Sequence, residues 1–145
     1  MQRHTRTLSD NHLRITVKNI LPGIICGTII MILCGLPGSC FPTIKTFWEW
    51  LGPDKIVHIL MFAGLAFSIL IGFRKTFANE TRKNKNILLL SALIISILFG
   101  GLTELLQKYV FIGRYGSVFD FFADAIGCVI GVLLFKILLK KNNKN

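Results

Sequence analysis

The sequence predicts an all-α membrane protein, a four-transmembrane-helix bundle with both termini cytoplasmic. Hydrophobic residues make up 52% of its 145 residues, and its mean hydropathy of +0.61 is above that of an ordinary soluble domain. Four apolar stretches are each long enough to cross a bilayer core of about 30 Å, which takes about 20 helical residues. Lys and Arg gather in the segments between these stretches, as topology signals do.

The four helices belong to one domain, with a basic segment at each end. The predicted units are the cytoplasmic N-terminal segment 1–19, the four-helix domain 20–139 with spans at about 20–36, 55–73, 87–110 and 118–139, and the cytoplasmic tail 140–145. Pro22 near its start and the run from Gly35 to Gly38 at its end predict where the first span opens and stops.

The orientation is predicted from the distribution of basic residues. Three segments are rich in them: Arg3, Arg6, Arg14 and Lys18; then Arg74, Lys75, Arg82, Lys83 and Lys85; then Lys140, Lys141 and Lys144. These segments share one side of the membrane only if the number of spans is even. The positive-inside rule then places both termini and the loop 74–86 in the cytoplasm. The outer connection 37–53 holds Trp48 and Trp50, whose rings favour the headgroup region.

The formal net charge of +10 does not indicate a nucleic-acid partner here, because the basic residues mark topology. The lipid bilayer is the expected partner, and the oligomeric state is left open. The four cysteines form no C-x-x-C motif and no spacing typical of zinc sites, so they predict a structural role and no metal centre of their own.

Ionisable side chains within membrane spans are costly and mark candidate functional sites. At the start of the second span, His58 lies four residues after Asp54 and three after Lys55, so each pair can meet on one helix face. One hypothesis makes His58 a proton donor or acceptor that Asp54 orients. The alternative is structural: Asp54 caps the helix, and His58 satisfies a buried partner.

The third span carries Glu104 and, one turn later, Gln107. Glu104 lies about 26 Å along the helix axis from Ile87, which places it near the outer boundary of the apolar core. The structural alternative is an interfacial Glu104 paired with Lys108.

The fourth span places Asp120, Asp124, Gly127 and Gly131 on one stripe, because each residue turns the helix by about 100°. The glycines favour a close approach of another helix, and the two carboxylates would point into the same interface. Arg114, in the short loop before this span, is the nearest cation by sequence, and a salt bridge alone is the structural alternative.

With the second and fourth helices running inward and the third outward, these residues are predicted to meet at one level near the outer surface. The expected catalytic residues are His58, Glu104, Asp54 and Asp120, and the expected substrate-binding residues are Lys55, Gln107, Arg114 and Asp124. A polar network that only locks the helices together is the alternative.

Taken in order, these residues resemble the VanZ-like family of bacterial membrane proteins. The matching pattern covers residues 53–131 and consists of Asp54-Lys55-x-x-His58, Glu104-x-x-Gln107, then Arg114, Asp120, Asp124, Gly127 and Gly131. The resemblance implies a multi-pass protein of the bacterial cytoplasmic (inner) membrane, in a family named for a member linked to resistance to the glycopeptide teicoplanin. The family often has Asn at the position of Asp124, so the charge of Asp124 is not expected to be essential. The resemblance implies no particular reaction.

Two functions from different classes follow. The first is an enzyme acting on a lipid-linked or cell-wall-related molecule, with activated water as nucleophile, because no G-x-S-x-G or H-E-x-x-H motif occurs. The second is a non-enzymatic protein that binds lipid head groups, cell-wall precursors or an amphiphilic antibiotic. A small transporter is third, since no inverted repeat is visible. No cofactor is evident; a divalent metal held by His58, Glu104 and Asp124 is a further hypothesis.

Overall fold

The structure, a computed structural model, describes residues 2–36, 53–113 and 116–142, with side chains for 17–36, 54–113 and 116–141. Every regular element in these ranges is a helix. The helices are α1 (Gln2–Gly35), α2 (Pro53–Gly72), α3 (Arg74–Asn79), α4 (Arg82–Tyr109) and α5 (Val118–Asn142). Four stretches are long and apolar enough to cross a membrane: Val17–Gly35, Asp54–Gly72, Arg82–Tyr109 and Val118–Lys141. The predicted all-α fold is therefore confirmed, and so is the presence of four helices long and apolar enough to cross a membrane.

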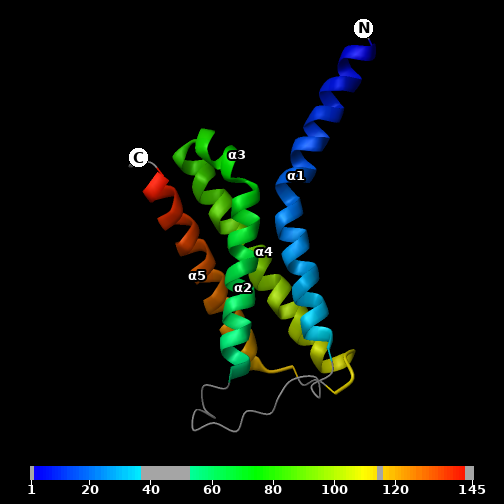
Figure 1. The fold of residues 1–145 in the computed structure, drawn as a ribbon, viewed down its shortest axis with the longest axis vertical. Helices are drawn as coiled ribbons and strands as arrows, with labels where there is room; N and C mark the ends of the chain where they lie inside the picture. Colours follow the sequence, from blue (N-terminus) through cyan, green and yellow to red (C-terminus); the bar gives the residue numbers. More distant parts are fainter. Residues whose placement is uncertain (1, 37–52, 114–115, 143–145) are drawn as a thin grey trace.

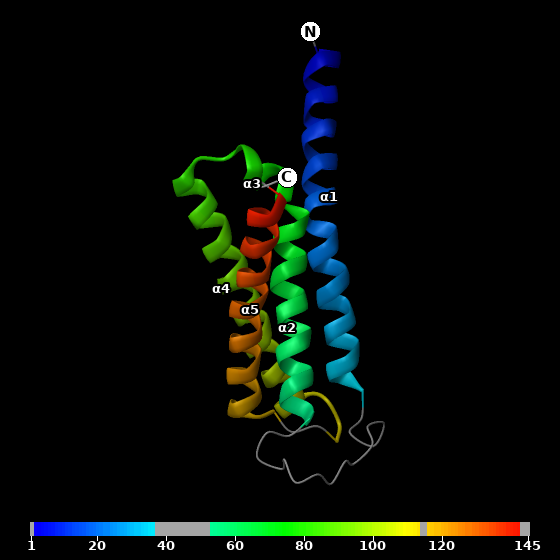
Figure 2. The ribbon, with the colours of Figure 1, turned by 60° about the vertical axis from the view of Figure 1, so that its left-hand side comes forward.

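The four long helices run alternately up and down, with α2 in the middle (Figures 1 and 2). Helix α2 packs most extensively against α5, and it also contacts α1 and α4. The N-terminal part of α1 projects beyond the bundle (Figure 1). We call the end where α2 and α5 begin the site end, and the opposite end, where they finish, the basic end.

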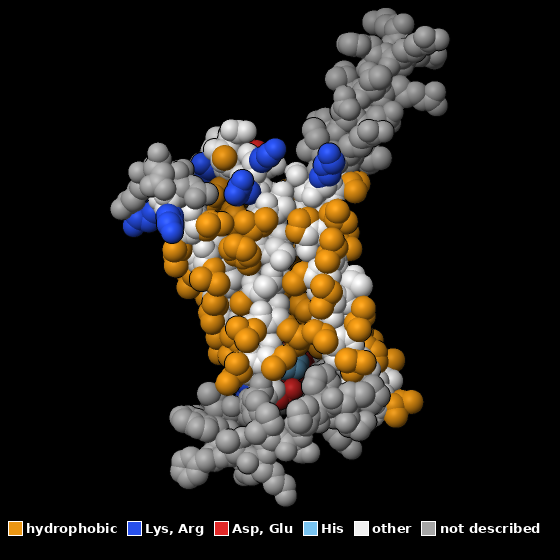
Figure 3. All heavy atoms as spheres, viewed as in Figure 1, with side chains coloured by type: hydrophobic (Ala, Val, Ile, Leu, Met, Phe, Trp, Pro, Cys, Tyr) orange, Lys and Arg blue, Asp and Glu red, His pale blue; other side chains and the backbone are white. Residues whose placement is uncertain are grey.

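The basic end takes its name from the charges that gather there (Figure 3). Its exposed basic residues are Lys18, Arg74, Lys75, Arg82, Lys83, Lys140 and Lys141. Between the two ends, large apolar side chains such as Leu60, Leu98 and Ile137 are exposed on the outside of the bundle. A belt of exposed apolar side chains is what a bilayer would cover.

Two clusters of buried side chains fill the interior. The first surrounds Phe62 and includes Ile30 and Cys34 from α1 and Cys128 from α5. The second surrounds Leu70 and Phe135, nearer the basic end, and Phe77 of the short helix α3 closes it. This apolar packing fixes the helix positions from which the polar side chains at the site end project.

Two helices begin earlier than the spans predicted on them. Helix α1 begins at Gln2, so Pro22 lies inside it and does not open it; a proline removes one backbone hydrogen bond, and the helix continues on both sides. Helix α4 begins at Arg82, before the apolar stretch, because the Thr81 hydroxyl accepts a hydrogen bond from the Asn84 backbone N–H at 3.4 Å. The loop predicted at 74–86 also contains α3.

Candidate functional site

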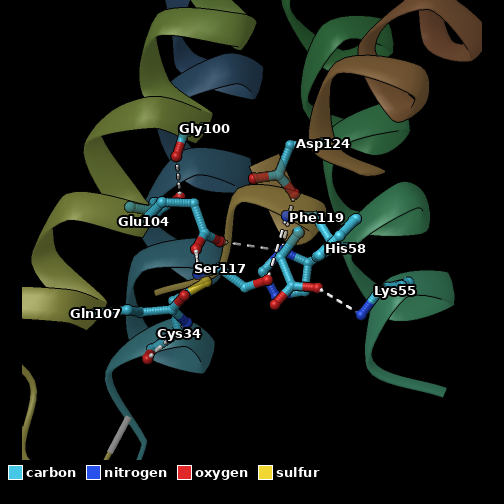
Figure 4. A network of polar contacts seen from close by, with 11 residues as sticks. Cys34, Lys55, His58, Gly100, Glu104, Gln107, Ser117, Phe119 and Asp124 are labelled. Atoms are coloured by element: carbon cyan, nitrogen blue, oxygen red, sulfur yellow. Dashed lines mark hydrogen bonds and ion pairs between the residues drawn. The ribbon is translucent and has the colours of Figure 1, made fainter. Parts of the chain in front are cut away.

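Three helices bring His58, Glu104 and Asp124 together at the site end (Figure 4). The Nδ1 atom of His58 lies 2.8 Å from Oδ1 of Asp124 and 3.8 Å from Oε1 of Glu104. All three residues are buried, with 3%, 0% and 8% of their surface exposed for His58, Asp124 and Glu104. We call these residues the buried triad.

Small residues allow the helices to come this close. A Cβ atom on Gly127 or Gly131 of α5 would overlap the backbone carbonyl of Ile59 or Ala63 in α2. A Cβ on Gly100 of α4 would lie 3.2 Å from Oδ2 of Asp124. The glycine stripe predicted on the fourth span is therefore confirmed as the contact surface for α2, and it brings the Asp124 side chain against α2 and α4.

A second polar contact lies next to the triad, nearer the N-terminal ends of α2 and α5. The Lys55 ammonium is 3.2 Å from Oδ1 of Asp120, with the Lys55 side chain 31% exposed and that of Asp120 8% exposed. Asp54, His58 and Asp120 each offer a ligand atom within 4.8 Å of one another, but Asp54 is exposed. Lys55 is thus the cation at the rim of the site.

Backbone groups complete the site, and the sequence reasoning missed them. The Ser117 N–H donates to Oε2 of Glu104 at 2.7 Å, and the Ser117 hydroxyl accepts from the Phe119 N–H at 3.2 Å. The Gln107 amide donates to the backbone carbonyl of Cys34 at 3.4 Å, which ties α4 to α1. A serine just before the fourth span was the available signal for the contact between the Phe119 N–H and the Ser117 hydroxyl, because serine is a preferred N-cap residue. No side-chain pattern could have revealed the Ser117 N–H as the partner of Glu104 or the carbonyl of Cys34 as the partner of Gln107.

Two carboxylate oxygens in the triad have no hydrogen-bond partner among the described residues. They are Oε1 of Glu104 and Oδ2 of Asp124, and both are buried. A buried polar atom without a partner costs free energy, so such atoms are rare in folded proteins. These two oxygens are therefore placed to receive a ligand, a proton or a cation.

All the predicted site residues that the structure describes lie together at the site end. Some of them, however, contact other partners than the sequence predicted. Asp124, and not the expected Asp54, is hydrogen-bonded to His58, because the close contact of α5 with α2 places it beside the imidazole. Lys108 lies over the Tyr109 ring, with its nitrogen 5.2 Å from the centroid. Arg114, Trp48 and Trp50 lie outside the described residues.

A comparison with protein families identifies a match over most of the chain. The model of the VanZ/LLP1 family matches residues 13–139, a range that includes the first three apolar stretches, all but the last two residues of the fourth, and every residue of the site. This match confirms the resemblance carried by residues 53–131 and extends it across the first helix. Searches of curated proteins and of solved structures found no significant match.

Proposed function

This chain belongs to the VanZ/LLP1 family, and we propose that its buried triad is the active site of an enzyme that acts on an amphiphilic molecule of the bacterial cell envelope. The observation that carries the proposal is the contact of His58 with two buried carboxylates, at 2.8 Å and 3.8 Å. An imidazole held by one carboxylate beside a second one is suited to general acid–base catalysis.

The proposed chemistry is hydrolysis, with water as the nucleophile. Asp124 orients His58 through their hydrogen bond, and either His58 or Glu104 accepts a proton from water while the other donates one to the leaving group. The Ser117 N–H holds one oxygen of Glu104, which leaves Oε1 directed to the imidazole. Water is the proposed nucleophile because the sequence has no G-x-S-x-G motif.

Lys55 and Asp120 are proposed to hold the charged head of the substrate. The Lys55 ammonium has three donors and makes one contact with Asp120. Since its side chain is 31% exposed, the remaining donors can meet a phosphate or carboxylate at the rim. Arg114 is proposed to add a second cation, as expected from its position in the sequence.

An apolar pocket supports an amphiphilic substrate. Between α1, α2 and α4 lies a cavity of about 680 Å³, lined by residues that include Gly23, Gly27, Met31, Leu65, Ile69 and Phe99. Leu65 follows His58 by seven residues, so the pocket begins about 10 Å along α2 from the imidazole. We propose that the hydrocarbon chain of a lipid-linked molecule occupies it. The same pocket also supports the second candidate function, in which the protein binds an amphiphilic molecule and catalyses no reaction.

We propose that the protein lies in the bacterial cytoplasmic membrane with the basic end inside and the site end outside. The support is the gathering of Lys and Arg at the basic end (Figure 3), which the positive-inside rule assigns to the cytoplasm. In this orientation the triad faces the outer leaflet, where lipid-linked cell-wall precursors and lipid head groups are exposed.

The test compares wild type with His58→Ala and Glu104→Gln in a bacterial host, with Glu80→Gln as the matched control. Glu80 is a carboxylate near the basic end, where it accepts a hydrogen bond from Asn84. Lipids and cell-wall precursors are profiled by mass spectrometry after equal membrane yields are verified. Wild type and Glu80→Gln should change the same envelope species at least tenfold more than the two triad variants. Identical profiles at equal yield would remove the enzymatic proposal.

A further inference from the structure

We propose that the buried triad binds one divalent transition-metal ion, Zn²⁺ or Mn²⁺, through Nδ1 of His58 and the carboxylates of Glu104 and Asp124. The ion's role in activating water rests on the proposed function, whereas its binding does not. One imidazole and two carboxylates are ligands that both ions accept. Three protein ligands would leave a further coordination position for water or substrate.

The donor atoms lie at the right separations for one shared ion. One ligand atom from each triad residue falls within 4.8 Å of the other two. The Nδ1 atom of His58 is 2.8 Å from the Asp124 oxygen and 3.8 Å from the Glu104 oxygen. An ion with bonds of about 2.1 Å holds neighbouring ligands about 3.0–3.4 Å apart, so each of the two distances from Nδ1 needs to change by only a few tenths of an ångström.

The two unpartnered oxygens are a separate observation that indicates a cation. Oε1 of Glu104 and Oδ2 of Asp124 are buried without a hydrogen-bond partner among the described residues. The other Glu104 oxygen is already held by the Ser117 N–H, which is how a second contact typically orients a metal-binding carboxylate. The 2.8 Å contact with Nδ1 is made by Oδ1 of Asp124, so an ion that Asp124 holds through both of its oxygens, together with Oε1 of Glu104, would give both unpartnered oxygens a partner. Such an ion would replace the present hydrogen bond between His58 and Asp124.

The charges of the triad itself also balance with a divalent ion. Lys55 and Asp120 neutralise each other at the rim. The two carboxylates of the triad together carry two negative charges when ionised, and a protonated His58 can offset only one of them. A divalent ion with a neutral imidazole offsets both, which matters because unbalanced charge is costly in a buried site.

The neighbouring group of Asp54, His58 and Asp120 is a weaker candidate for the same ion. Its ligand atoms also lie within 4.8 Å of one another. However, Asp54 is exposed to solvent, and Asp120 is already paired with Lys55. The ion is therefore assigned to the buried triad, and the test must separate the two groups.

The test measures ion binding directly on the purified full chain in lipid nanodiscs. After treatment with a chelator, the protein is dialysed against Zn²⁺ or Mn²⁺, and bound metal is quantified by mass spectrometry. Wild type should bind one equivalent of at least one ion. Glu104→Gln and Asp124→Asn keep the side-chain shapes and should weaken binding at least tenfold. Glu80→Gln and Asp54→Asn should bind as wild type does.

Two results would overturn the proposal: no saturable binding of either ion by wild type, or loss of binding in Asp54→Asn with Glu104→Gln unaffected. If the triad variants do not fold, the melting temperature of wild type still tests the proposal. A bound ion must raise this temperature in proportion to the logarithm of the ion concentration. Binding without any change in envelope species would refute the enzymatic function alone. If His58→Ala changes the profile of envelope species but wild type binds no metal, the metal site alone is refuted.

Discussion

Among the described residues, Lys55 and Asp120 form one of two polar side-chain contacts between α2 and α5 at the site end, the one nearer the helix N-termini, with nitrogen and oxygen 3.2 Å apart. The other contact is that of His58 with Asp124. Each pair takes one residue from the first turns of α2 and one from the first turns of α5. The three-residue step from Lys55 to His58 and the four-residue step from Asp120 to Asp124 keep the two pairs on the same helix contact.

Lys55→Met should destabilise the fold, because it leaves the Asp120 side chain, which is 8% exposed, without its cation. We expect a loss of about 1–3 kcal/mol in the free energy of unfolding, less than for a fully buried pair because Lys55 is partly exposed to solvent. The double variant Lys55→Met/Asp120→Asn should regain part of this loss. Unfolding in detergent micelles measures both, and equal stability of Lys55→Met and wild type would contradict the prediction.

Among the helices, α2 and α5 make the contact on which the site depends. Their backbones approach so closely that a Cβ on Gly127 or Gly131 would overlap carbonyl atoms of α2. Gly127 lies one turn from Asp124, and its neighbour Ile59 follows His58 directly. Any separation of these two helices would therefore also lengthen the contact between the imidazole and the carboxylate.

Gly127→Ala should force α2 and α5 apart and cost about 1–3 kcal/mol, the range for overpacking a tight interior. Gly101→Ala is the matched control on α4, because its Cβ would lie 3.5 Å from a Phe121 ring carbon, an ordinary contact. In that control, alanine should stabilise the helix by up to about 1 kcal/mol. The melting temperatures of both variants and of wild type are measured in the same detergent. A Gly127→Ala variant as stable as Gly101→Ala would refute the close packing of α2 and α5.

For the molecule as a whole, the two ends differ in charge and in the polar side chains that they bury. The basic end gathers Lys and Arg from α1, α3, α4 and α5 (Figure 3). The site end carries the triad and the pair of Lys55 with Asp120. Because basic residues are retained on the cytoplasmic side, this asymmetry supports the proposed orientation.

Cysteine labelling tests the orientation in intact cells. In a Cys40→Ser background, Ile112→Cys reports the site end, since Ile112 is 92% exposed, and Asn79→Cys reports the basic end, where Asn79 is exposed. A membrane-impermeant maleimide should label the first variant before lysis and the second only after it. The reverse pattern would place the triad in the cytoplasm and remove an outer-leaflet substrate.

The sequence by itself determined the four spans, the shared level of the polar residues and the glycine stripe on α5. Hydropathy and helical spacing are local properties, so they can be read without knowing the neighbours of a helix. Only the tertiary structure decided that His58 bonds Asp124 instead of Asp54, and that Glu104 accepts from the Ser117 backbone. These partners depend on how each helix is rotated and how closely it packs, which is set by contacts between residues distant in sequence.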